Sequence, residues 1–203
     1  GFAFATPLAM HWVFSRPSTL QTLTKSGAKL QAHPSFRKAV AGMSTEQVQQ
    51  FTQTHAVLGL KRLAFPQLKR WNSLRLKMAA ISPTLCAGFW TGRGMSGTLV
   101  QTALAQMAPA DVQEWIDLSV DAALLDIDQV AFPPISAEAM QNGIASIARK
   151  MSKSDTQRIQ LTMMAAGKAK DADACWVMKA FLSGAESLPA NEQEQFIRAL
   201  ASM

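Results

Sequence analysis

Apolar residues recur every three or four positions along most of this 203-residue chain, and this spacing constrains its fold more than any other feature. Val48, Phe51 and Leu58 illustrate the pattern, because they fall on one face of a helix. Ser44 and Gln47 precede them in the order of a capping box, which satisfies free N–H groups at a helix start. No run alternates apolar and polar residues as a half-buried strand does. The sequence therefore predicts an all-α protein.

Prolines and serines divide the chain into separate helices. Phe65-Pro66 and Pro109 each restart the pattern, and Pro133-Pro134 ends the helix that Pro109 begins. Between them, Ser82-Pro83 leads into a glycine-rich hinge. Four further helix starts are predicted, at Ser136, at Ser154 with Gln157 as a second capping box, near Asp171 and at Pro189. We predict a single domain of about eight helices over residues 1–203, with a candidate lobe boundary near residues 132–136.

Charge is divided along the chain rather than mixed. Residues 1–100 hold twelve Lys/Arg and one Asp/Glu, whereas residues 101–203 hold eight Lys/Arg and thirteen Asp/Glu. Six of the bases lie between positions 61 and 77, with no acid among them. Interspersed charges serve solubility better than segregated ones, so this division favours a role in contacts. The helix predicted from Pro109 places its acids opposite its apolar face, at Asp111, Glu114, Asp117, Asp121 and Asp128.

The helix predicted from Gln67 is both basic and amphipathic. Leu68, Trp71 and Leu74 share one arc of this helix, and Lys69 lies outside that arc. Cations beside a tryptophan can contact phosphates, anionic lipid head groups or an acidic protein. Two alternatives stay open, because the basic and acidic helices can face each other or both remain solvated. The predicted docking residues are Lys61, Arg62, Lys69, Arg70, Trp71, Arg75 and Lys77.

These features favour a non-enzymatic function. We expect a helical interaction or adaptor protein that docks a partner protein or an anionic membrane surface through the basic helix. Nucleic acid is disfavoured as the partner, because an acidic helix offsets the basic excess and no binding motif is present. A homo-oligomer is compatible with the sequence. The alternative function is a hydrolase or thiol enzyme with its site in residues 86–97.

Residues 86–97 hold the features on which the enzyme alternative rests. Cys86 and Ser96 are the candidate nucleophiles, and such a group needs a base beside it. Gly92, Gly94 and Gly97 spell G-x-G-x-x-G, but no strand precedes them, so a dinucleotide site is not expected. Glycine-rich backbone at a helix start can still hold an anion. This leaves a candidate anion or ligand site at Trp90, Arg93 and Gly94.

Histidines and acids form no recognisable metal or catalytic set. His11, His33 and His55 are the three histidines of the chain, and none is paired with another ligand at metal-binding spacing. His55 lies on an apolar helix face, which favours a hydrogen-bonded core residue. Asp126 and Asp128 resemble the start of a calcium loop, but the glycine and the late glutamate of such a loop do not follow. We therefore expect no metal and no cofactor, and we assign no catalytic residue.

The cysteines and the N-terminal segment bear on the compartment. Cys86 and Cys175 sit among apolar neighbours, which favours two buried thiols, whereas a periplasmic location would favour a disulfide. Residues 1–16 carry no charge before Arg16 and are too short to span a bilayer. We interpret them as a buried apolar segment, with a trimmed signal peptide or a membrane anchor as the alternative. No compartment is assigned, and the cell envelope is favoured over the cytoplasm.

Overall fold

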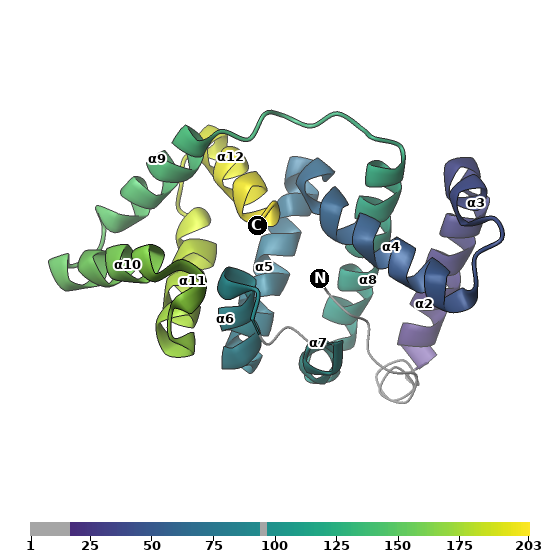
Figure 1. The fold of residues 1–203 in the computed structure, drawn as a ribbon, viewed down its shortest axis with the longest axis horizontal. Helices are drawn as coiled ribbons and strands as arrows, with labels where there is room; N and C mark the ends of the chain where they lie inside the picture. The colour runs from purple at the N-terminus through teal and green to yellow at the C-terminus, as the bar shows by residue number, and fades with distance from the viewer. Residues whose placement is uncertain (1–16, 94–96) are drawn as a thin grey trace. The chain divides into compact units, whose positions relative to one another are not determined.

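The computed structural model describes residues 17–93 and 97–203, and within them the chain is all-α, as predicted (Figure 1). These residues hold eleven α-helices, two short 3₁₀ turns and no strand. The helices are α2 (Pro17–Ala32), α3 (Pro34–Val40), α4 (Thr45–Gly59), α5 (Phe65–Ile81), α6 (Pro83–Thr91), α7 (Gly97–Ala105), α8 (Pro109–Ile127), α9 (Ala137–Ala148), α10 (Lys153–Ala165), α11 (Asp171–Ala185) and α12 (Ala190–Ala201). The 3₁₀ turns are η1 (Leu60–Arg62) and η2 (Ala166–Lys168).

The eleven helices of the described chain exceed the predicted eight, because short helices carry little periodic signal. α3 has seven residues, and α6 has nine. In α6, five consecutive residues from Leu85 to Phe89 are buried. A helix buried all round lacks the polar face that creates an amphipathic pattern. The first part of the predicted hinge is therefore helical, and the left-handed Gly92 (φ +70°) ends it.

Serine side chains cap several helix starts. Ser44 Oγ accepts a hydrogen bond from the Gln47 N–H (3.2 Å), and Gln47 Oε1 accepts one from the Ser44 N–H (2.9 Å). This confirms the predicted capping box. The second predicted box, at Ser154, is wrong, because Ser152 caps α10 two residues earlier by accepting from the Asp155 N–H (3.1 Å).

The helices form two compact units that the chain enters in turn. Unit 1 comprises residues 1–67 and 96–132, and unit 2 comprises residues 68–95 and 133–203. The chain passes between the units three times, and the first passage falls inside α5, between Gln67 and Leu68. The predicted lobe boundary near 132–136 lies at the third passage, between Phe132 and Pro133.

The core of unit 1 forms where α4 packs across α8 (Figure 1). Gly59 of α4 allows this approach, because a Cβ at its position would lie 1.8 Å from the backbone oxygen of Ala122. Phe36 of α3 packs with Val120 and Leu124 of α8 in an apolar cluster. These contacts bring the basic N-terminal helices of the chain onto the acidic helix α8.

Unit 2 is organised around α11, which packs against α6 and α9. Phe181 of α11 is fully buried and meets Phe196 of α12 edge to face, with 6.0 Å between the ring centroids. α9 approaches α12 at Gly143, where a Cβ would lie 2.2 Å from the Phe196 ring. The buried Phe196 ring opposite Gly143 therefore sets the spacing of α9 and α12.

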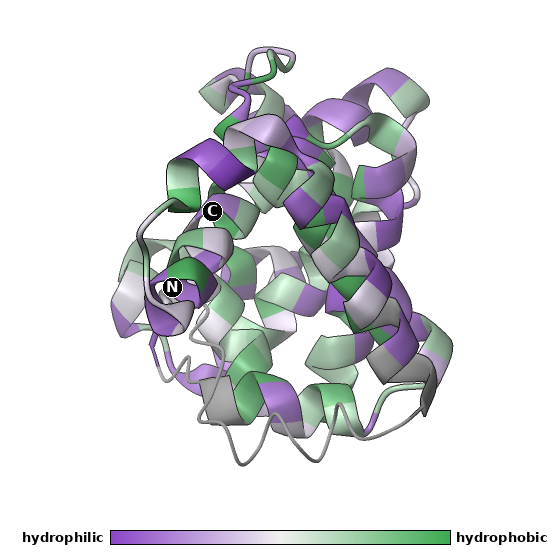
Figure 2. Ribbon diagram, turned by 90° about the vertical axis from the view of Figure 1, so that its right-hand side faces the viewer, coloured by the Kyte–Doolittle hydropathy of each residue, from purple (hydrophilic) through white to green (hydrophobic). Residues whose placement is uncertain are grey.

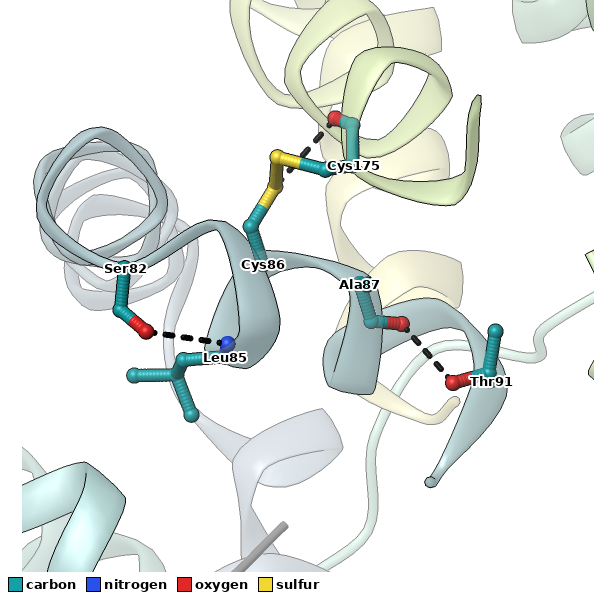
Figure 3. Close-up of a disulfide and its surroundings, with 6 residues drawn as sticks. All are labelled: Ser82, Leu85, Cys86, Ala87, Thr91 and Cys175. Carbon is teal, nitrogen blue, oxygen red and sulfur yellow. Dashed lines mark hydrogen bonds between the residues drawn. A yellow bond between two sulfur atoms is a disulfide. The ribbon is translucent and has the colours of Figure 1, made fainter. Parts of the chain in front are cut away.

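A disulfide joins Cys86 of α6 to Cys175 of α11 (Figure 3). The sequence-based expectation of two separate thiols is therefore wrong, although both residues are buried as expected. The packing of α6 on α11 brings residues 89 apart in sequence to a Cα–Cα distance of 4.9 Å, within the range that a disulfide bridges. No local sequence pattern around either cysteine indicates that the two are in contact.

Hydrophilic and hydrophobic residues alternate at short intervals along the described helices (Figure 2). This matches the amphipathic spacing of the sequence. Among the helices that the structure describes, none is both long enough and apolar enough to cross a membrane.

Removing the disulfide should lower the stability of unit 2. The bond closes a loop of about 90 residues, for which chain-entropy arguments give a stabilisation of about 4–5 kcal/mol. We expect the double variant Cys86→Ala, Cys175→Ala to unfold at lower denaturant concentration than the oxidised protein. Thiol titration of the unreduced, unfolded chain provides the control, and finding two free thiols there would contradict the disulfide.

Candidate docking site

α5 exposes three of the predicted docking residues on one side. Lys69, Arg70 and Lys77 are all solvent-exposed. They fall within about 100° around the helix axis at 3.6 residues per turn. Leu68 and Met78 point away from this arc and are fully buried. The exposed side of α5 is therefore cationic, while its apolar side belongs to the core.

Two of the predicted docking residues lie inside the protein instead. Trp71 is 3% exposed, so its ring is not presented to a partner. Arg75 is 7% exposed; it donates a hydrogen bond to the Leu200 carbonyl (3.1 Å) and stacks on the Phe89 ring at 4.9 Å. Burial lowers the pKa of Arg75 to about 10, which leaves it charged at neutral pH. Arg75 thus anchors α5 to α12 and α6 rather than extending the cationic side.

Lys61 and Arg62 belong to unit 1 and contact the segment after α8. Both lie over the Phe132 ring, at 5.4 and 5.0 Å from its centroid. Arg62 also donates to the Val130 carbonyl and to Gln129 Oε1. With a side chain 11% exposed, Arg62 is a structural residue.

An acid stands at the middle of the cationic side of α5. Ser73, which falls between the exposed cations around the helix, donates to Glu186 Oε1 across 3.4 Å. Glu186 is the C-cap residue of α11 and is exposed. A carboxylate at Ser73 lowers the positive potential on this side of α5.

In unit 1, the acids of α8 meet the bases of the N-terminal helices. Lys29 of α2 pairs with Asp121, and His33 Nε2 lies 2.8 Å from Asp128 Oδ2. The hydrogen bond from His33 lowers the pKa of Asp128. This pair therefore adds stability above the ordinary pKa of an aspartate and loses it as the pH falls through the lowered pKa. The separation of basic and acidic residues along the sequence is thus partly cancelled in the folded unit 1.

The central pairing of unit 1 is that of a buried aspartate, Asp126, which the sequence offered only as part of a calcium-loop-like pair with Asp128. Asp126 Oδ2 lies 2.6 Å from His55 Nδ1, and its Oδ1 accepts from Arg62 Nε at 2.9 Å. The Asp126 side chain is 5% exposed. A signal was present, because Asp126 falls on the same arc of α8 as Val112 and Trp115, which are buried.

A histidine–aspartate pair is also part of hydrolase triads, which require a nucleophile beside the histidine. The His55 ring instead packs on Phe51, with 4.2 Å between the centroids. Cys86, the candidate thiol nucleophile, is in a disulfide, and Ser96 and His11 lie outside the described residues. The His55–Asp126 pair thus lies within the packing of unit 1, as the apolar face around His55 indicates.

The candidate anion site near the glycines is only partly described. Trp90 is half-buried and packs edge to face on Phe181 at 5.7 Å. Arg93 donates to the Ala169 carbonyl and lies 3.6 Å from Asp171, at the start of α11. Gly94 lies outside the described residues. Arg93 is thus held against α11, with its guanidinium half-exposed.

Metal ligands do not gather in the part of the chain that the structure describes, where no three His, Cys, Asp or Glu side chains form a cluster. No protein-family model, curated protein or solved structure matches this chain.

Replacing Asp126 with asparagine should destabilise unit 1 strongly. The change leaves the nearly buried Arg62 guanidinium without a carboxylate, which typically costs about 3–5 kcal/mol. Asp117→Asn provides the matched control, because Asp117 is exposed on the same helix and should change stability by less than about 0.5 kcal/mol. Equal effects of the two substitutions on the free energy of unfolding would show that Asp126 is not a buried charge.

Proposed function

We propose that this protein is a non-enzymatic helical interaction protein that docks an acidic partner protein through the exposed side of α5. The observation that carries the proposal is that Lys69, Arg70 and Lys77 share one exposed side of a helix whose opposite side is packed in unit 2. A packed helix fixes the backbone positions of these residues, which removes part of the ordering cost of an ionic contact.

The distribution of charge between the units supports this choice. Unit 1 contains seven Lys/Arg and seven Asp/Glu and is neutral. Unit 2 contains thirteen Lys/Arg and seven Asp/Glu, so it carries the whole net charge of +6. An anionic partner is therefore attracted to unit 2 in particular.

A protein partner is favoured over a membrane surface by the burial of α5. Helices that lie in a membrane interface insert an apolar face, often with Trp or Phe, into the acyl region. In α5, Leu68, Trp71, Leu74 and Met78 are buried. The other large apolar residues of the helix, Phe65, Leu76 and Ile81, are half-buried. Little apolar surface of α5 is left to insert into a lipid interface, which makes a complementary acidic protein surface the better match.

The disulfide bears on both the enzyme alternative and the compartment. Its formation removes the thiol that a Cys86-dependent enzyme would use as a nucleophile. Disulfides persist in oxidising compartments. The bond between Cys86 and Cys175 therefore supports a location in the cell envelope rather than the cytoplasm.

Photo-cross-linking from α5 tests this function directly. We expect a cross-linking residue at exposed position Ala80 to capture an acidic protein in the native host. The variant Lys69→Glu, Arg70→Glu, Lys77→Glu should reduce the captured amount about tenfold, because three exposed contacts of below about 1 kcal/mol each act together. Raising the salt concentration should have the same effect, since the screening length is about 8 Å at 0.15 M.

The control variant reverses three other lysines of unit 2, Lys150, Lys153 and Lys179, and should lower capture much less than the α5 variant does, although the net charge changes equally. Equal capture by wild type and the α5 variant, with the fold intact, would refute the docking role. Binding of phosphatidylglycerol vesicles that depends on Lys69, Arg70 and Lys77, without any captured protein, would show that the partner is a membrane surface.

Glu186→Gln should strengthen the same interaction. The substitution removes the negative charge next to Ser73 while keeping a hydrogen-bond acceptor there. It should raise the yield of the cross-linked complex without lowering stability, because a negative charge at a helix C-terminus is unfavourable. A reduced yield would place Glu186 among the residues that the partner needs.

A further inference from the structure

A groove in unit 2 lies between α10, η2 and the first turn of α11, and its residues are different from those of the α5 docking side. It has a volume of about 640 Å³. The α10 wall includes Gln157, Arg158 and Leu161, and the opposite wall includes Lys168 and Lys170. The residues lining α10 run from Ser154 to Ala165, which is about three helical turns or about 16 Å.

One large apolar side chain of α10 is exposed in this groove, and a second is exposed beside it. Leu161 lines it and is 58% exposed. Met164 follows one turn later and is 83% exposed, the largest exposure among the large apolar residues of the described chain. Residues three apart on a helix are neighbours, so the two side chains form one apolar strip. Exposed methionines suit helix-binding surfaces, because the flexible thioether adapts to its partner.

The charges around the groove are unbalanced in favour of cations. Arg158 stacks on Trp176 at 4.5 Å, and its Nε and Nη2 both lie 2.9 Å from Asp173. Asp171, the other acid of the first turn of α11, pairs with Arg93. Asp171 and Asp173, the two acids at the start of α11, are therefore each paired with an arginine.

Among the described residues, no acid pairs with Lys168 or Lys170 in this way. Both are exposed, line the groove, and make no ion pair within the residues that the structure describes. Lys170 is the N-cap residue of α11 and makes no capping hydrogen bond with its side chain. Its charge lies at the positive end of the helix dipole, where a cation is unfavourable and an added carboxylate is favourable.

We propose that this groove binds an acidic amphipathic helix of a partner protein. The apolar face of the incoming helix covers Leu161 and Met164, and its carboxylates reach Lys168 and Lys170. The length of the groove matches about three turns of helix, and the arrangement corresponds to the helix-in-groove mode of recognition. The proposal does not depend on the α5 docking side, so either can fail alone.

A designed peptide tests the groove in the intact, oxidised protein. The probe is a helical peptide of Leu and Glu with one apolar face, compared with a Leu and Lys peptide of the same pattern. We expect the acidic peptide to shift the backbone amide signals of Thr162, Ala165 and Lys168, and to bind at least about tenfold more tightly than the basic peptide. Addition of salt should weaken its binding.

Two double variants separate the charge from the apolar strip. Lys168→Glu, Lys170→Glu should weaken binding of the acidic peptide about tenfold, because two exposed contacts of below about 1 kcal/mol each are reversed. Leu161→Gln, Met164→Gln should weaken it to a similar extent. All four side chains are exposed, so the fold should be retained. The matched controls are Lys150→Glu on the surface of unit 2 and Leu58→Gln, an exposed leucine of α4.

Three results would overturn the proposal. One is the absence of amide shifts at about 1 mM acidic peptide, the range of weak recognition. Another is equal binding of the acidic and basic peptides, or equal binding by the groove and control variants. The third is binding of anionic vesicles that needs Lys168 and Lys170 while the peptide leaves the groove unaffected, which would make it a membrane contact.

Discussion

A carboxylate buried among helices must be paired, and Asp126 imposes this requirement on unit 1. One of its oxygens faces His55 of α4, and the other accepts a hydrogen bond from Arg62 of η1. Arg62 in turn holds the segment after α8 through the Val130 carbonyl and the Phe132 ring. Because an unpaired buried charge is costly, the helices that carry these groups must come together around the end of α8.

This internal pairing changes what the charge of the chain means. Along the sequence, the first half is strongly basic and the second half acidic. In space, α8 lies with the N-terminal helices, so their charges cancel and the excess of +6 belongs to unit 2. The exposed cations of α5 and the lysines beside α11 are both in that unit. An interaction role for unit 2 therefore agrees with the charge of the folded units.

Local patterns predicted the helices well, while contacts distant in sequence stayed hidden. The capping box at Ser44 and the buried arc of α5 follow from spacings within one helix. The pairing of Cys86 with Cys175 depends on how α6 packs on α11, which no local spacing encodes. Arg75 was grouped with the exposed cations, because burial of a long side chain depends on neighbours such as Phe89.

The central claim is that positive potential is concentrated on unit 2 while the end of α8 is neutralised. Paramagnetic broadening of backbone amides by an anionic and by a cationic nitroxide measures the local potential along the chain. The anionic probe should broaden residues 69–80 and 168–171 more than the cationic probe does, and residues 121–128 should show little preference. Strong preferential broadening of residues 121–128 by the cationic probe would contradict the neutralisation of α8 within unit 1.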